Sequence, residues 1–242
     1  MAHGTPDYAI TNALATVYRM NDLGELAVRL GSPVAFDRRG DVLWWDDFEC
    51  GIAKWTATLA GTGAAVAVDE THPYNGSQAV KLTAGSDGDQ YAQIAVALPL
   101  PVFGRHGLEV SFGTLDEPDQ VEMYVFSQNA AQQVGGALRW NNATNTLEYF
   151  NSASGWTSLG ALSVWTSAPF GYHTMKLVFD RDTGLYARAI FDSQAFDLSA
   201  IAANVTAGAP APNMRITIKN VGRAGVNDAI YVDDVIATRN EP

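Results

Sequence analysis

Cysteine is almost absent from this chain. Cys50 is the single cysteine among 242 residues, so no disulfide can form within the chain. Long apolar runs are also missing, and none approaches the ~18 residues that a membrane span needs. The first residues, Met1 to Asp7, carry neither the basic region nor the apolar core of a secretory signal. We therefore expect a domain stabilised by its core, with no membrane span, made without the usual export information.

Charged residues are scarce, at 17% of the chain, where soluble domains typically carry about 25%. The net charge is −11, and the 15 Lys and Arg residues are scattered along the sequence. Because nucleic-acid backbones are held by clustered Lys and Arg, the sequence argues against nucleic acid as a partner. An acidic surface can favour divalent cations, although a solvated surface without a partner is the simpler interpretation. Hydrophobic residues make up 47% of the chain, enough for a sizeable core.

Motifs that carry catalytic chemistry are missing too. The four histidines are isolated from one another, and no His-x-x-x-His, Cys-x-x-Cys, Gly-x-Ser-x-Gly or phosphate-binding glycine loop occurs. The nearest match to the alternating carboxylates of a glycoside hydrolase is residues 116–122, where Pro118 interrupts any central strand. Glu117 and Glu122 have odd spacing and would point to opposite faces. The sequence predicts no enzyme; a polysaccharide hydrolase or lyase with an unrecognised site stays an alternative.

The first 35 residues have a helical pattern. Apolar residues recur at helical spacing in two short stretches, Ile10 to Val17 and Leu23 to Leu30. Asp22 and Glu25 resemble a helix start, and Gly31 stands where a helix would end. Two short amphipathic helices cannot bury their apolar stripes alone. We expect residues 1–35 to form a docking or assembly arm, which packs either on its own chain or on a neighbouring subunit, so that the protein is a homo-oligomer or part of an assembly.

From Phe36 onward the pattern becomes that of β-strands. Short apolar runs recur between turn-rich segments at residues 41–48, 64–68, 79–82, 91–98, 108–112, 121–126, 137–140, 147–150, 173–179, 186–191, 214–218 and 229–237. The segment Asp180 to Gly184 joins two strong strands and predicts a hairpin loop. Many short strands with no long helix between them are typical of a sandwich or barrel. Residues 36–242 are therefore expected to form one all-β domain.

Several segments carry a resemblance to jelly-roll carbohydrate-binding modules. Residues 45–49 (Trp-Asp-Asp-Phe-Glu), Trp55 and residues 74–82 resemble the opening of these modules, and residues 230–235 (Ile-Tyr-Val-Asp-Asp-Val) resemble the strand that closes them. The resemblance implies an antiparallel jelly-roll β-sandwich, preceded here by the short helical N-terminal arm.

A second resemblance lies in the middle of the chain. Residues 172–180 (Tyr-His-Thr-Met-Lys-Leu-Val-Phe-Asp) followed by residues 184–186 (Gly-Leu-Tyr) are similar to a hairpin of concanavalin A-like and laminin G-like domains. These are signatures of a lectin-like fold, and a fold alone does not specify an activity.

In the carbohydrate-binding modules, acidic residues of the opening and closing segments often share a structural calcium. Carried over, this implies Glu49 and Asp233 as ligands, together with Asp47 or Glu70. Calcium takes six to eight oxygen ligands, which carboxylates from both chain ends plus carbonyls can supply. In the alternative interpretation, acidic residues such as Asp46 and Asp47 stand at strand ends and face water.

Exposed aromatic rings would serve sugar binding, because they stack on sugars while one edge stays wet. Trp156 follows the turn-rich segment 151–155 and is expected in an exposed turn, with Tyr149 facing the same way. Trp44 and Trp45 are adjacent, so one of them points outward, and Trp45 is the third candidate. The alternative is that all six tryptophans belong to the core or support it, as we expect of Trp55, Trp140 and Trp165.

The absence of an export signal decides the functional hypothesis. A lectin-like fold without a secretion signal but with an assembly arm suits a virion protein, which folds in the host cytoplasm and is released by lysis. The general style of the chain resembles phage capsid decorations, fibres and tail appendages. We expect a non-catalytic structural or adhesion protein of a virus particle, with residues 1–35 as the anchor to self or virion subunits. The alternative is a carbohydrate-binding module of an extracellular protein, with a glycan as partner.

Overall fold

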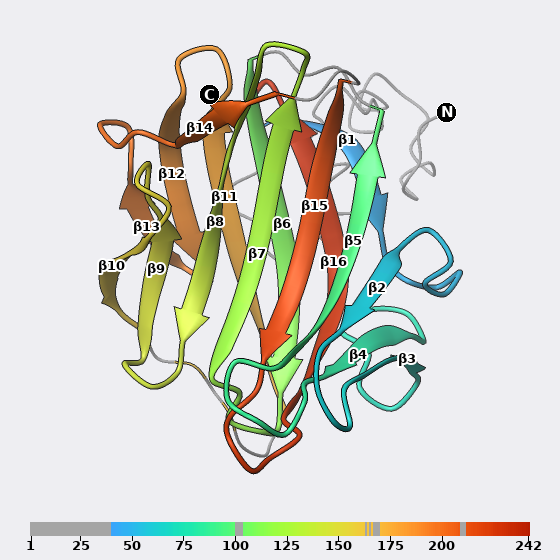
Figure 1. The fold of residues 1–242 in the computed structure, drawn as a ribbon. Helices are drawn as coiled ribbons and strands as arrows, with labels where there is room; N and C mark the ends of the chain where they lie inside the picture. Colours follow the sequence, from blue (N-terminus) through green and yellow to red (C-terminus); the bar gives the residue numbers. More distant parts are fainter. Residues whose placement is uncertain (1–39, 100–103, 163, 165, 167–169, 209–211) are drawn as a thin grey trace, which may run out of the picture.

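The computed structural model describes residues 40–242 apart from 100–103, 163, 165, 167–169 and 209–211. The expected arm of residues 1–35 and the expected domain start at Phe36 lie outside the described residues. The described chain folds into two antiparallel β-sheets that stack face to face (Figure 1). The prediction of an all-β antiparallel sandwich is confirmed. None of the described residues form a helix long and apolar enough to cross a membrane.

Eight strands make the first sheet, which we call sheet A. They are β1 (Asp41–Asp46), β3 (Ala65–Asp69), β4 (Ala79–Thr83), β6 (Arg105–Thr114), β11 (Tyr172–Asp180), β12 (Leu185–Phe191), β13 (Gln194–Asp197) and β16 (Ala229–Arg239). The strand order is β13-β12-β11-β6-β16-β4-β3, and β1 also pairs with β16. The last strand of the chain therefore lies inside the sheet, between β6 on one side and β4 and β1 on the other.

Eight further strands make the second sheet, sheet B. They are β2 (Thr56–Leu59), β5 (Tyr91–Leu98), β7 (Gln120–Gln128), β8 (Gln132–Asn141), β9 (Thr146–Phe150), β10 (Trp156–Ala161), β14 (Asn204–Ala207) and β15 (Asn213–Val221). The order is β10-β9-β8-β7-β15-β5-β2, with β14 pairing with β8. Because neighbouring strands β15 and β7 are distant in sequence, this sheet forms only when the whole chain has come together.

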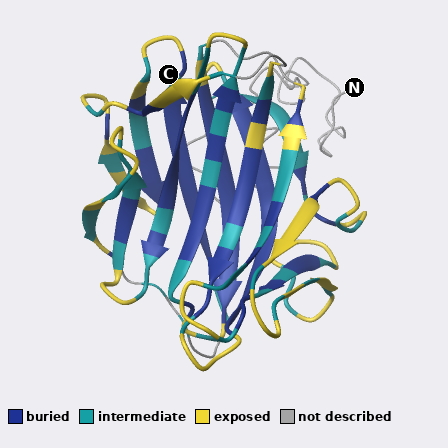
Figure 2. Ribbon diagram, viewed as in Figure 1, coloured by how far each residue is buried: buried dark blue, intermediate teal, exposed yellow. Residues whose placement is uncertain are grey.

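The inward side chains of both sheets make one apolar core. Phe112 of β6 and Trp140 of β8 are both fully buried and stack across the sandwich with their ring centres 6.2 Å apart. Burying an apolar side chain of this size contributes about 1.5–3 kcal/mol. The central strands are mostly buried, with intermediate or exposed bands along them, while the edge strands and loops are more exposed (Figure 2). The core, rather than any cross-link, is the main source of stability, and Cys50 is a free exposed thiol.

The strand runs of the sequence correspond to strands of the structure, and the hairpin at Asp180 to Gly184 is confirmed between β11 and β12, with Gly184 at φ +68°. Four short strands were missed: β2, β10, β13 and β14. These strands are mostly polar or exposed and lie at sheet edges, so their apolar pattern is weak. The expectation of Trp156 in a turn was wrong, because Trp156 begins strand β10.

Candidate functional site

The outward face of sheet B combines aromatic rings with charged groups. In strand β7, Val121, Met123 and Val125 point into the core, so the residues between them point outward. The strand register places outward residues of neighbouring strands side by side, for example Tyr124 opposite Thr217 of β15. We call the following set the sheet B face: Tyr91, Gln93, Glu122, Tyr124, Phe126, Gln133, Arg139, Glu148, Phe150, Trp156, Arg215, Thr217 and Lys219.

Two neighbouring hollows open on this face. One has a volume of about 370 Å³ and lies towards strand β2, with Thr56 and Thr58 in its lining. The other has a volume of about 340 Å³ and is lined by Tyr91 and Tyr124 among others. Phe126, Gln133 and Arg215 line both hollows, so the two are parts of one depression across the middle of the sheet.

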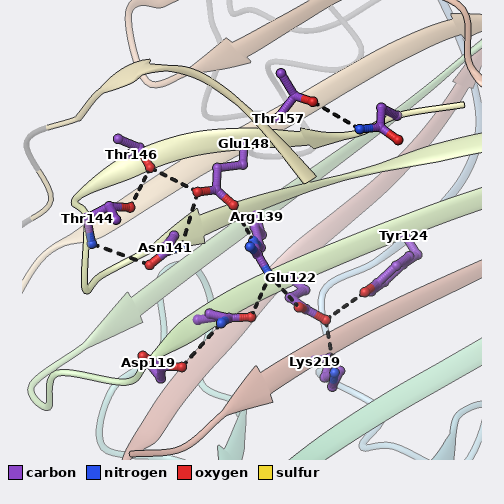
Figure 3. A network of polar contacts seen from close by, with 12 residues as sticks. Asp119, Glu122, Tyr124, Arg139, Asn141, Thr144, Thr146, Glu148, Thr157 and Lys219 are labelled. Atoms are coloured by element: carbon purple, nitrogen blue, oxygen red, sulfur yellow. Dashed lines mark hydrogen bonds and ion pairs between the residues drawn. The ribbon is translucent and has the colours of Figure 1, made fainter. Parts of the chain in front are cut away.

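A network of charges surrounds Glu122, which is buried at 3% side-chain exposure. Its Oε2 accepts a hydrogen bond from the Tyr124 hydroxyl at 2.7 Å and forms an ion pair with Lys219 Nζ at 3.1 Å. Arg139 Nη1 lies 3.8 Å from the other carboxylate oxygen. Figure 3 shows these side chains converging from strands β7, β8 and β15. Each carboxylate oxygen therefore faces a cation, which offsets the cost of burying the charge.

The network continues through Arg139 to strand β9. Arg139 Nε donates to Glu148 Oε2 at 2.5 Å (Figure 3). The other oxygen of Glu148 accepts from Asn141 Nδ2 and from Thr146 Oγ1, both at 3.2 Å. Hydrogen bonds to both carboxylate oxygens of Glu148 hold this side chain in one rotamer.

The aromatic rings of the face are held by cations and by each other. The Arg139 guanidinium lies 4.4 Å from the centre of the Trp156 ring, and Lys219 Nζ lies 4.8 Å from that of Tyr91. Trp156 also meets Phe150 edge-to-face, with ring centres 5.4 Å apart. Each cation thus binds a carboxylate and a ring at once, so the aromatic and charged parts of the sheet B face form one preorganised unit.

Tyr124 keeps its proton at neutral pH. Burial first, and then the negative charge of Glu122, raise the pKa of the phenol far above its usual value. The hydroxyl is therefore protonated and donates its hydrogen bond to Glu122.

The three predicted sugar-binding aromatics do not share one face. Trp156 lies on the sheet B face, half-buried. Tyr149 pairs with Thr157 and points the other way, into the sandwich, where its ring lies 5.9 Å from that of Tyr186, so the expectation that it faces the same way as Trp156 was wrong. Trp45 pairs with Ile236 and points to the outward side of sheet A, on the far side of the core from the sheet B face.

The remaining tryptophans behave as expected where they are described. Trp55 and Trp140 belong to the core, and Trp44 packs against it with its ring 5.6 Å from that of Trp55. Trp165 lies outside the described residues.

The predicted metal residues Glu49 and Asp233 clamp the same loop. Asp233 Oδ2 accepts from the backbone N–H groups of Tyr74 and Asn75 at 2.9 and 3.1 Å. Glu49 Oε1 accepts hydrogen bonds from the backbone N–H groups of Ser77 and Gln78 at 2.6 and 2.9 Å. The hydrogen bond from the Ser77 hydroxyl, and then these two backbone bonds, lower the pKa of Glu49. The opening and closing segments of the domain are thus connected through the loop between them.

Of the other predicted ligands, Asp47 lies near Asp233 and Asp234, whereas Glu70 is exposed. Burial raises the pKa of Asp233 to about 6, and burial and the Asp233 charge raise that of Asp234 to about 7. The Oδ1 atom of Asp234 is buried without a hydrogen-bond partner, while Asn75 donates to its other oxygen. Among the described residues, no three acidic, His or Cys side chains group closely enough to hold a metal ion.

Most residues of the sheet B face, including Glu122, Tyr124, Arg139 and Lys219, were not predicted from the sequence. A signal was present, because charged and aromatic residues alternate with apolar ones in the middle of strands β7 and β15. A charged residue at the centre of a sheet is unusual unless it is paired or functional. The partners come from strands that are far apart in sequence, which is why the pairing itself could not be foreseen.

Comparison with known proteins supports the fold. No protein-family model matches the chain, and no curated protein matches it. It is similar to the solved structure of the cellulose induced protein Cip1, with a TM-score of 0.53, 16% identity and coverage of 82% of this chain and 99% of that one. The fold is the concanavalin A-like β-sandwich.

Two further solved structures share this sandwich. An endo-β-1,4-glucuronan lyase from the fungus Trichoderma reesei has a TM-score of 0.55 at 13% identity, covering 82% of this chain and 96% of that one. The carbohydrate esterase vb_24B_21 from the Shiga toxin-encoding bacteriophage phi24B has a TM-score of 0.52 at 16% identity, covering 84% of this chain and all of that one. At these identities the similarity shows the fold and not the activity.

Proposed function

We propose that this chain is a non-catalytic carbohydrate-binding protein and that its glycan site is the sheet B face. The observation that carries the proposal is the depression lined by Tyr91, Tyr124, Phe126 and Arg215, with the Trp156 ring beside it. Aromatic side chains with a few fixed polar groups in a concave surface are the usual composition of a small-ligand site. The similar structures named for carbohydrate-active proteins support a sugar as the ligand.

A sugar suits the chemistry of this face. The apolar faces of pyranose rings stack on aromatic side chains, and sugar hydroxyls exchange hydrogen bonds with fixed side chains. Gln93, Gln133 and Thr217 provide donors and acceptors within the depression. Arg215 is exposed and adds a positively charged donor beside Phe126.

The arrangement of the carboxylates on the sheet B face suits the binding of a glycan better than its hydrolysis. Glycoside hydrolysis needs one protonated carboxyl group as general acid and a second carboxylate nearby. Glu122 and Glu148 are both already engaged in ion pairs within the protein, Glu122 with Lys219 and Glu148 with Arg139. Tyr124 is protonated and already donates to Glu122, so it is not available as a base for a lyase reaction. This non-catalytic role is part of the proposal.

Binding to an array of neutral and acidic oligosaccharides tests the proposal. We expect one class of glycan to bind, and Trp156→Ala to weaken that binding at least about tenfold, in line with the ~1–2 kcal/mol of a lost aromatic contact. Tyr74→Ala is the matched control, because this aromatic is 39% exposed on the loop beside sheet A. Silence across the array, or equal losses in both variants, would overturn the site; product formation from a bound glycan would overturn the non-catalytic role.

A structural calcium ion forms the second part of the proposal. Its ligands would be the carboxylates of Asp233 and Asp234 together with carbonyl or water oxygens, because the two charges interact and Asp234 Oδ1 is buried without a hydrogen-bond partner. Asp47 lies near this pair without completing a group of three carboxylates. Glu49 is already saturated by loop hydrogen bonds and Glu70 is exposed, so neither is included. Calcium should raise the melting temperature by several degrees and magnesium less, since a ligand that binds only the folded state stabilises it. Asp234→Asn should remove the effect; an unchanged melting temperature with calcium would exclude this site.

A place in a virus particle is compatible with glycan binding and remains our proposal for the biological setting. One similar structure is a bacteriophage protein described as a carbohydrate esterase, and adhesion through glycans is a role that a lectin-like sandwich can fill. Co-purification of the chain with particles, at a fixed number of copies per particle, would support this setting. Recovery only as a free protein, never with particles, would contradict it.

A further inference from the structure

The outward side of sheet A is buried, although a two-layer sandwich should leave it open to water. Strand register places Ile236, Glu109, Lys176 and Ile190 in one row across strands β16, β6, β11 and β12. Their exposures are 2%, 3%, 2% and 2%. Such values are typical of an interior, so this row is covered.

This row does not belong to the core between the sheets. The core uses the alternate residues of the same strands, such as Leu108, Leu177 and Val235. Val178, Ile190 and Ile236 are also buried, but their side chains point to the outward side of sheet A, because successive residues of a strand point to opposite faces. Sheet A therefore has two apolar sides, a pattern usual for sheets covered on both faces.

Two described segments reach the margins of this surface. The C-terminal tail covers one margin, where Glu241 pairs with Lys176 Nζ at 3.1 Å and with Arg188. The loop at Tyr74 and Asn75 covers the other margin through its bonds to Asp233. All described strands are part of the two sheets, so none of them forms a third layer over the central row.

The N-terminal segment is the part of the chain that can supply this layer. Gly40, where the described chain begins, lies at the covered margin: a β-carbon on Gly40 would stand 2.7 Å from Oε1 of Glu241. The other undescribed stretches are at most four residues long, whereas 39 residues precede Gly40. These residues include the two apolar stripes at Ile10 to Val17 and Leu23 to Leu30, which need an apolar surface to cover them.

We propose that residues 1–39 pack on the outward side of sheet A of the same chain and form a third layer of the domain. Ile190, Ile236 and Val178 are the apolar surface that receives them. The segment starts at the margin of that surface and need not cross another part of the fold, which favours its own chain over a neighbour. The indole nitrogen of Trp45, which stands opposite Ile236, is buried as well and marks the same covered area.

Thiol labelling of the full-length chain tests this layer. In a Cys50→Ser background, Ile190→Cys places a single thiol under the proposed layer, and Val205→Cys places one at a site that is 48% exposed on sheet B. We expect the thiol at 190 to react at least about tenfold more slowly, because a covered group reacts only through local opening. Ile236→Cys repeats the measurement if the first variant does not fold. Equal rates at the covered and exposed sites would overturn the proposal.

A second substitution tests whether residues 1–39 supply the layer over sheet A. Leu26→Asp puts a charge into the apolar stripe and should speed labelling at position 190 several-fold while leaving position 205 unchanged. Asn21→Asp adds the same charge outside the stripe and should change neither rate. A labelling rate at position 190 that stays the same in the Leu26→Asp variant would overturn the proposal. Protection that disappears on dilution would also overturn it, because the layer would then come from a neighbouring chain.

Discussion

Arg139 lies over the ring of Trp156 at 4.4 Å while its Nε donates to Glu148 at 2.5 Å. One guanidinium thus holds an aromatic platform and a carboxylate from strands β10 and β9 in a fixed geometry. The planar fork of Arg suits this double role, which a Lys ammonium cannot fill in the same way. We regard this contact as the centre of the candidate glycan site.

Replacing Arg139 tests that view. Arg139→Lys keeps the charge but loses the stacking and the second hydrogen bond, so the Trp156 ring is no longer fixed. We expect glycan affinity to fall about tenfold, and the free energy of unfolding to fall by about 1–2 kcal/mol. Titration calorimetry and urea unfolding measure the two effects. Arg105→Lys, at an exposed ion pair of sheet A, is the control, and similar losses in both variants would argue against a special role for Arg139.

Tyr124 separates ring stacking from hydrogen bonding. Tyr124→Phe keeps the ring but removes the 2.7 Å hydrogen bond to Glu122, which should cost about 1.5–3 kcal/mol of unfolding free energy because the acceptor is charged and buried. Tyr124→Ala removes both. If stacking carries the sugar contact, glycan affinity falls much more for Ala than for Phe. Equal affinity losses in the two variants would show that the hydroxyl, and not the ring, binds the ligand.

The buried pair Asp233 and Asp234 predicts an unusual pH dependence. Their pKa values of about 6 and about 7 lie above the ~3.9 of an unfolded aspartate. Between these limits the folded chain binds more protons than the unfolded chain, so stability falls as the pH rises. In calcium-free buffer we expect the melting temperature to drop by several degrees between about pH 4 and pH 7.

A substitution isolates the contribution of this pair. Asp234→Asn cannot ionise and should flatten the decline above about pH 5. Asp197→Asn, at a carboxyl whose pKa is lowered by its hydrogen bonds to Ser199, should leave the decline unchanged. A profile of Asp234→Asn that follows the parent protein would contradict the assignment.

Strand β8 approaches Tyr186 so closely at Gly136 that we expect no larger residue to be tolerated there. A β-carbon at Gly136 would stand 1.9 Å from the Tyr186 hydroxyl, which donates to the Phe150 carbonyl at 2.6 Å. Gly136→Ala should therefore displace a buried ring and cost about 1–3 kcal/mol. Gly88→Ala has no neighbour within 4 Å and should be nearly neutral. Urea unfolding measures both, and equal stability of the two variants would contradict the predicted clash.

Much of the fold was predictable because it depends on local pattern. Runs such as residues 91–98 coincide with strand β5 residue for residue, since alternation and turn residues both operate over a few positions. The short edge strands, β10 among them, have few apolar residues and are stabilised by a single neighbour, which left Trp156 assigned to a turn.

The all-β class, the hairpin at Asp180 to Gly184 and the absence of an internal disulfide follow from the amino-acid sequence alone. Tertiary structure alone decided which charges meet, since Glu122, Arg139 and Lys219 are brought together from β7, β8 and β15 by strand pairing. It also decided that Glu49 and Asp233 clamp one loop, and that Tyr149 faces inward. The physical reason is the same in each case: periodicity assigns a residue to a face, but its neighbours across a sheet depend on strand order, which closes only when the whole chain folds.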